Sequence, residues 1–338
     1  MITKNLNLFD FVAHQPLENF IKTKLAMKEK SEPKIVLPLY RVIKQVKDDK
    51  ELQKLNPDQR EYLTWPHIRL NIPDVWSQTQ GEGVRVAVLD TGIDTDHPDL
   101  SGQIVSTKDF TGEGIEDVNG HGTHCAGIIA AKLNDVGFIG VAPKTELIIG
   151  KVLANDGSGS YDWISDGVLW AFEEGADVIS MSLGGPDSTP ELFNSIHHVL
   201  AQGGKIICAA GNDGSLYTNN VGYPGKYGGV ITVASHDYNG NPSGFSSRGG
   251  ELDFMAPGDG IWSTYTNGGY RQLSGTSMAT PYVAGLAALI ISKHKQLGGE
   301  TPIHNNEDLR NHLIWMASHP GYFTSDEGYG ALLPFKYF

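Results

Sequence analysis

The sequence predicts an α/β fold in which a central, mostly parallel sheet carries helices on both faces. Three observations support this prediction. Short apolar segments alternate with helical segments from residue 84 onward. The 41 glycines follow no fixed period, which indicates many tight turns and argues against a helical bundle. The 338 residues, 40% of them hydrophobic, suffice to bury one large core.

Residues 1–57 differ from the rest of the chain, because they are rich in lysine and almost free of glycine. Residues 11–30 show helical periodicity, and the apolar run IVLPLYRVI (35–43) is interrupted by Pro38, which disfavours a regular central strand. Residues 1–50 carry ten Lys/Arg and six Asp/Glu, which gives them a net charge of +4. Because the whole chain has a net charge of −13, residues 51–338 carry a net charge of −17. We predict an N-terminal extension at 1–57 and one main domain at 58–338.

The main domain contains five expected strands separated or flanked by three expected helices. The strands are VRVAVLD (84–90), ELIIGKVL (146–153), DVISMSL (177–183), GKIICAAG (204–211) and GVITVAS (229–235). The helices are HGTHCAGIIAAKL (121–133), SDGVLWAFEEG (165–175) and PELFNSIHHVLAQGG (190–204). A further helix follows Ser277 and is apolar on all sides, so we expect it to cross the middle of the domain, with Pro281 in its first turn.

Composition also excludes several classes of function. The acidic main domain disfavours nucleic acid as a partner. We expect no membrane association, since no stretch reaches the length of a membrane span. The N-terminus lacks the apolar core of a signal peptide, and two cysteines cannot form a disulfide framework. A cytoplasmic location follows, while secretion by an unrecognised route stays open.

Three segments place reactive side chains at the ends of expected strands or helices. AVLDTGIDTDHPDL ends a buried strand at Asp90, NGHGTHCAG begins a helix at His121, and SGTSMATP begins another at Ser277. In α/β proteins, such ends are where working groups are exposed. Taken singly, an aspartate, histidine or serine there is an ordinary cap or surface residue. The combination of the three therefore carries the argument.

Together these segments resemble those of the subtilisin-like serine proteases. The resemblance runs from about residue 65 to residue 332 and includes KVLANDGSGSYDWI, ISMSLGGP, AAGNDG, VGYPGKY and FSSRGGELDFMAPG. It implies the three-layer subtilisin-like fold and a serine endopeptidase that forms an acyl-enzyme. Ser277 would attack the peptide carbonyl, and His121 would take the serine proton and pass it to the leaving amine. Asp90 would orient the imidazole. Asn212 would stabilise the oxyanion.

The resemblance also implies positions for the substrate, which consists of proteins and peptides. Two extended edges would hold a substrate strand, and glycines would line a primary pocket deep enough for a large apolar side chain. Tyr161 resembles the lid of the pocket for the fourth residue before the cut. The implied residues are Ser158, Gly159 and Tyr161 at one edge, Ser182, Leu183 and Gly184 at the other, and Gly211 and Gly222 in the pocket.

A calcium site is implied in the same way. Asp99 and Asn134 match the strong calcium site of the family, and main-chain oxygens near the LNDVGF turn complete an all-oxygen shell. The alternative is a tight turn that contains an asparagine. The implied ligands are Asp99, Lys132, Asn134, Val136 and Phe138.

The N-terminal extension resembles the short prosegments of intracellular subtilisins. Its VLPLY stretch is similar to their Leu-Ile-Pro-Tyr motif, with a leucine added between Pro38 and Tyr40. We therefore expect a precursor, or zymogen, in which Leu37, Pro38, Leu39 and Tyr40 inhibit the enzyme until the prosegment is removed. The chain itself would then be a binding partner of its own N-terminus, and the sequence leaves a homodimer open.

A second hypothesis belongs to a different class. The chain could be a catalytically silent relative that acts as a binding or maturation partner. The intact set of Asp90, His121, Ser277 and Asn212 argues against this hypothesis. Labelling of Ser277 by a fluorophosphonate would separate the two.

Overall fold

The computed structural model describes residues 34–36, 41–46, 62–214, 219–298 and 303–338. Its centre is a seven-stranded sheet in the order β10-β9-β8-β7-β3-β5-β4, in which all neighbouring strands are parallel. The strands are β3 (Arg85–Asp90), β4 (Ile104–Asp109), β5 (Glu146–Lys151), β7 (Val178–Met181), β8 (Ile206–Ala209), β9 (Ile231–His236) and β10 (Phe254–Pro257). All five expected strands are present, and β4 and β10 are additional edge strands.

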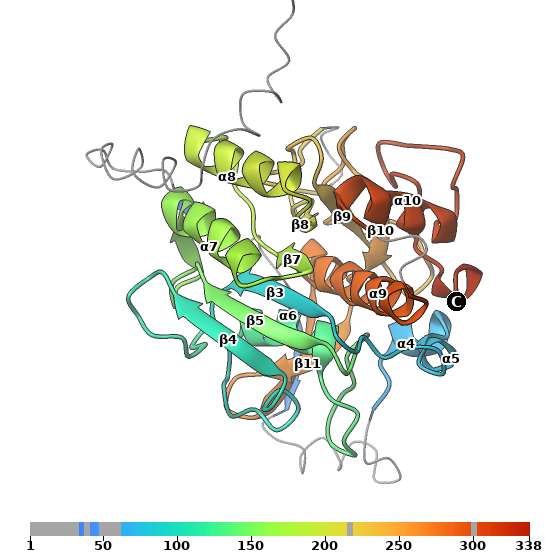
Figure 1. The fold of residues 1–338 in the computed structure, drawn as a ribbon, viewed down its shortest axis with the longest axis horizontal. Coiled ribbons are helices and arrows are strands. Elements are labelled where there is room, and N and C mark those ends of the chain that lie inside the picture. The colour runs from blue at the N-terminus through green and yellow to red at the C-terminus, as the bar shows by residue number, and fades with distance from the viewer. Residues whose placement is uncertain (1–33, 37–40, 47–61, 215–218, 299–302) are drawn as a thin grey trace, which may run out of the picture.

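Helices cover both faces of this sheet (Figure 1). One apolar cluster joins the sheet to α7 (Tyr161–Glu173) and α8 (Pro190–Ala201), which lie side by side. The other cluster lies on the opposite face and includes α6 (His121–Ala130), α9 (Thr276–Gln296) and α10 (Asn306–Met316). The expected three-layer α/β fold is thereby confirmed.

Helix α9 passes through the core, as its uniformly apolar sequence predicts. Residues 276–292 are all buried. Side-chain caps begin α7 and α8: Ser160 accepts from the Trp163 N–H at 3.1 Å, and Thr189 accepts from the Leu192 N–H at 3.3 Å. In the part of the chain that the structure describes, no helix combines the length and apolar character needed to span a bilayer.

Two small sheets flank the central one. Strand β1 (Lys34–Val36) pairs antiparallel with β6 (Ser158–Ser160), and β2 (Arg41–Val46) pairs with β12 (Gly269–Ser274), which also pairs with β11 (Ile261–Tyr265). The short elements are α4 (Trp65–Arg69), α5 (Ile72–Val75) and the 3-10 helix η1 (Pro334–Lys336). The N-terminal extension thus adds one strand to each small sheet.

Candidate active site

The structure places Asp90 and His121 in direct contact. Asp90 ends β3 and His121 begins α6, and the imidazole Nδ1 lies 2.8 Å from Asp90 Oδ1 and 3.0 Å from Oδ2. Both side chains are buried. Burial disfavours the charged imidazole, but the Asp90 carboxylate outweighs this effect and raises the pKa of His121 well above its ordinary value. The arrangement suits a histidine that receives a proton during a reaction.

The loop before His121 is held by a buried carboxylate. Asp117 accepts hydrogen bonds from the Gly120 N–H, the Thr123 N–H and hydroxyl, and the Thr91 hydroxyl, all at 2.7–2.8 Å. Gly120 has a φ of 95°, and a Cβ there would lie 2.2 Å from the Tyr265 ring, so only glycine fits. The start of α6, and with it His121, is therefore fixed in place.

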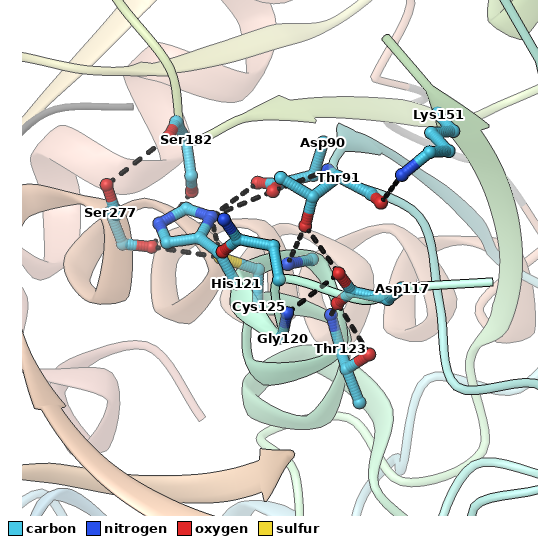
Figure 2. A network of polar contacts seen from close by, with 12 residues as sticks. Asp90, Thr91, Asp117, Gly120, His121, Thr123, Cys125, Lys151, Ser182 and Ser277 are labelled. Carbon is cyan, nitrogen blue, oxygen red and sulfur yellow. Dashed lines mark hydrogen bonds and ion pairs between the residues drawn. The ribbon is translucent and has the colours of Figure 1, made fainter. Parts of the chain in front are cut away.

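Ser277 lies beside this pair, at the second residue of α9. Figure 2 shows the His121 ring between the Asp90 carboxylate and Ser277. The Ser277 hydroxyl donates to the carbonyl oxygen of Ser182 at 3.2 Å. The structure thus brings together the three residues that the motifs singled out.

The prediction that Pro281 lies in the first turn of its helix was wrong. It is the sixth residue of α9 and lies inside the helix. Proline has no N–H to donate to the carbonyl four residues earlier, which here belongs to Ser277. That carbonyl accepts instead from the Ser182 hydroxyl at 2.8 Å and from the Cys125 thiol at 3.4 Å. Burial raises the pKa of Cys125, so the thiol stays protonated and acts here as a hydrogen-bond donor.

Asn212 follows strand β8 and faces the start of α9. Its Oδ1 accepts from both the N–H and the hydroxyl of Thr276, each at 2.9 Å. These two bonds fix the amide orientation, because an oxygen that accepts two donors directs the amide nitrogen the other way. Sequence reasoning missed Thr276, although it directly precedes Ser277 in the same motif.

The residues expected to bind substrate lie on or next to strands β6, β7 and β8, helix α7 and the segment around Gly222. Ser158 and Gly159 lie on β6, Tyr161 begins α7, and Ser182, Leu183 and Gly184 directly follow β7. A Cβ on Gly222 would lie 3.3 Å from the Gly185 carbonyl oxygen, and one on Gly211 would lie 2.9 Å from Ser247 Oγ. Both glycines therefore pack closely against other chain segments.

The N-terminal extension contacts the expected substrate edge. Lys34, Ile35 and Val36 pair with Ser160, Gly159 and Ser158, respectively. Ile35 is completely buried in the cluster that contains Tyr161, and a Cβ on Gly185 would lie 3.0 Å from its Cγ1. Strand β2 pairs with β12, whose last residue, Ser274, lies three residues before Ser277. Leu37, Pro38, Leu39 and Tyr40 lie outside the described residues.

The expected calcium ligands come from two segments in contact, Asp99 and the turn of residues 132–138. Asp99 is fully buried, its Oδ2 accepts from the Phe138 N–H at 3.3 Å, and its carbonyl accepts from the Lys132 N–H at 2.9 Å. Asn134 donates to the Pro98 carbonyl at 3.4 Å and accepts from the Val136 N–H at 3.1 Å. A buried carboxylate next to a turn of amide and carbonyl oxygens fits a hard cation.

Comparison with known proteins agrees with this geometry. The chain matches the model of the subtilase family over residues 81–331. It is 49% identical over 229 residues to an intracellular serine protease of Paenibacillus polymyxa, covering 65% of this chain and 70% of that protein. It is 45% identical over 237 residues to the major intracellular serine protease of Bacillus subtilis (67% and 74%), and 41% identical over 244 residues to thermitase of Thermoactinomyces vulgaris (71% and 86%). This chain therefore belongs to the subtilase family.

Proposed function

We propose that Ser277 is the nucleophile with which this subtilisin-like serine endopeptidase hydrolyses peptide bonds in proteins. Its hydroxyl would attack the carbonyl carbon and form an acyl-enzyme. His121 would take the hydroxyl proton and give it to the leaving amine, while Asp90 would hold the imidazole and stabilise its charged form. The observation that carries this proposal is the 2.8 Å contact between His121 Nδ1 and Asp90 Oδ1 beside Ser277.

Asn212 would donate its side-chain amide to the oxyanion that forms on the substrate, together with the N–H of Ser277. The two bonds from Thr276 to Asn212 Oδ1 support this role, because they orient the amide before substrate arrives. Loss of such a donor is known to cost subtilisin about 3 to 4 kcal/mol of transition-state stabilisation.

We propose that a substrate strand binds between β6 and residues 182–184. The observed pairing of β1 with β6 supports this, because it shows that the β6 edge accepts an antiparallel strand. The primary pocket would be lined by Gly211 and Gly222 and would favour a large apolar side chain. Tyr161, which belongs to the same apolar cluster as Ile35, would line the pocket for the fourth residue before the cut.

We propose that residues 1 to about 55 are an autoinhibitory prosegment removed by proteolysis. Strands β1 and β2 support this, since one covers the proposed substrate edge and the other pairs with the strand that leads to Ser277. Leu37, Pro38, Leu39 and Tyr40, which connect these strands in sequence, would block cleavage, because Pro38 lacks an N–H to donate. The competing possibility is a passive arm that only stabilises the domain.

Expression of residues 56–338, with the 1–55 peptide added in trans, separates these two roles. Inhibition by the peptide, relieved by salt and by substitution of Leu37 and Tyr40, would support the prosegment. A truncated enzyme that is no more active than the full chain and indifferent to the peptide would contradict it.

We propose that calcium stabilises the fold at the loop of residues 132–138. Asp99 and Asn134 would supply side-chain oxygens, and Lys132, Val136 and Phe138 would supply main-chain oxygens. The buried Asp99 carboxylate supports the assignment, because a cation would offset the cost of burying its charge. Calcium here would be structural and would take no part in the chemical step.

We further propose that the protein acts inside the cell. Two of the relatives above carry the word intracellular in their names. Its partners would be protein substrates and its own prosegment.

Labelling by a fluorophosphonate tests the proposed nucleophile and the silent-partner alternative together. The probe should label the activated parent at Ser277, and Ser277→Ala should lose both labelling and peptide hydrolysis while keeping its fold. An unlabelled parent, or an active Ser277→Ala variant, would overturn the mechanism.

A further inference from the structure

Lys151 is a completely buried lysine at the end of strand β5 that the proposed chemistry does not use. Its register partners on the neighbouring strands are Asp90 and Asp109. Burial lowers the pKa of its ammonium group, and nearby carboxylates oppose this effect; they belong to Asp117, Glu113, Asp109 and Asp90. A buried charge costs free energy unless it is paired, so the hydrogen bonds of the Lys151 ammonium show what the burial of this charge is used for.

The first contact of Lys151 leads to Asp90. Its Nζ donates to the carbonyl oxygen of Thr91, the residue directly after Asp90 (Figure 2). The Thr91 N–H donates to Asp90 Oδ1 at 2.7 Å, and the Thr91 hydroxyl accepts from the Gly122 N–H at 2.9 Å in the helix that carries His121. The ammonium thus holds the main chain of the residue that orients the Asp90 carboxylate.

The second contact leads to the proposed substrate edge. Lys151 Nζ also donates to Asn155 Oδ1 at 3.0 Å. Asn155 lies in the turn before β6, and the neighbouring Ala154 N–H donates to the carbonyl of Ser158 at 2.7 Å. The Asn155 carbonyl accepts from Asn119 Nδ2 at 3.3 Å, two residues before His121. One ammonium therefore connects the Asp90 segment, the β6 turn and the His121 loop.

We propose that Lys151 is a positioning residue for peptide hydrolysis, which holds Thr91 and Asn155 so that Asp90, His121 and the β6 edge keep their relative placement. This inference rests on the proposed roles of Asp90 and His121. A lysine suits the task, because its long side chain reaches from the strand to both acceptors and its charge balances the buried carboxylates. A neutral side chain of similar length would fill the space without holding either oxygen.

A purely structural lysine would change stability alone, whereas a positioning lysine also changes catalysis. Misplacement of catalytic groups by about 1 Å costs on the order of a hundredfold in rate. The charge predicts a second effect. Asp90, Cys125 and His124 interact electrostatically with His121, and Lys151 interacts with Asp90, the partner of the imidazole. A cation beside this pair disfavours the imidazolium. Removing the Lys151 charge should therefore shift the acid limb of kcat/KM to higher pH.

The test compares Lys151→Met with a matched control, Lys205→Met, in the full-length chain after activation. Lys205 is a half-buried lysine whose Nζ also donates to main-chain carbonyls, those of Gly203 and His304, but it directly precedes β8, away from Asp90 and Asn155 in the sequence. We expect Lys151→Met to lower kcat by about 10- to 100-fold and to raise the pH of the acid limb. Lys205→Met should lose thermal stability with unchanged kcat and pH profile.

Titration of active sites with a fluorophosphonate normalises each rate to folded enzyme. The same titration of the parent tests Ser277, so failure of the proposed nucleophile is seen separately from failure of this inference. If Lys151→Met does not fold, Asn155→Ala supplies the test: it keeps the charge, so kcat should fall about three- to tenfold while the acid limb stays in place. An unchanged kcat per titrated site in the variant that folds, or an equal loss in Lys205→Met, would overturn the proposal.

Discussion

Replacement of Ile35 by alanine should weaken binding of the N-terminal segment about a hundredfold. The side chain is fully buried beside Tyr161 and Gly185. The change removes three carbon atoms, worth about 0.8 kcal/mol each, or about 2.4 kcal/mol of transfer free energy. The site cannot collapse, because Gly185 is held by two hydrogen bonds to the Tyr223 main chain, at 2.8 and 2.9 Å. The remaining cavity raises the loss to about 3 kcal/mol, a factor of about 150.

The assay measures the dissociation constant of 1–55 peptides from the 56–338 protein by calorimetry. The protein carries Ser277→Ala, so that it cannot digest the peptide. Lys34→Ala is the matched control, because its side chain is exposed on the neighbouring position of the same strand. We expect it to change the dissociation constant less than threefold. Equal affinities for the parent and Ile35→Ala peptides, or an equal loss for both variants, would refute the packing argument.

Three further changes have defined outcomes. Asn212→Leu should lower kcat by about a hundredfold or more with little change in KM, since in its proposed role the amide acts mainly in the transition state. Steady-state kinetics that show only a KM effect would contradict that role. Excess EGTA should lower the melting temperature, because calcium bound at the proposed site would stabilise the folded state by mass action, and an unchanged temperature would exclude the site at Asp99 and Asn134. Burial lowers the pKa of His67 to about 4. Between about pH 6.5 and pH 4, His67 is therefore protonated in the unfolded chain but not in the folded chain. As the pH falls through this range, His67 should lower the free energy of unfolding by about 3 kcal/mol. His67→Gln should flatten this loss in urea unfolding, and an identical pH slope would contradict the reasoning.

The sequence was most informative where chemistry and local pattern coincide. The five expected strands are buried on both faces and therefore appear as continuous apolar runs. The missed strands of the central sheet, β4 and β10, are its two edges. Strand β4 reads IVSTKD and alternates in exposure, and β10 has four residues and ends in Pro257, so neither carries the signal of a central strand.

The sequence by itself determined the fold class and the family and singled out Asp90, His121 and Ser277, because these inferences depend on strand periodicity and on motifs a few residues long. Only the tertiary structure decided what surrounds them. Ile35 is buried beside Tyr161, Lys151 joins Thr91 to Asn155, and Ser182 and Cys125 donate to the Ser277 carbonyl that Pro281 leaves without a helical partner. All of these are contacts between distant segments. A buried polar group must find a partner wherever the fold places one, and no local pattern encodes which distant segment provides it.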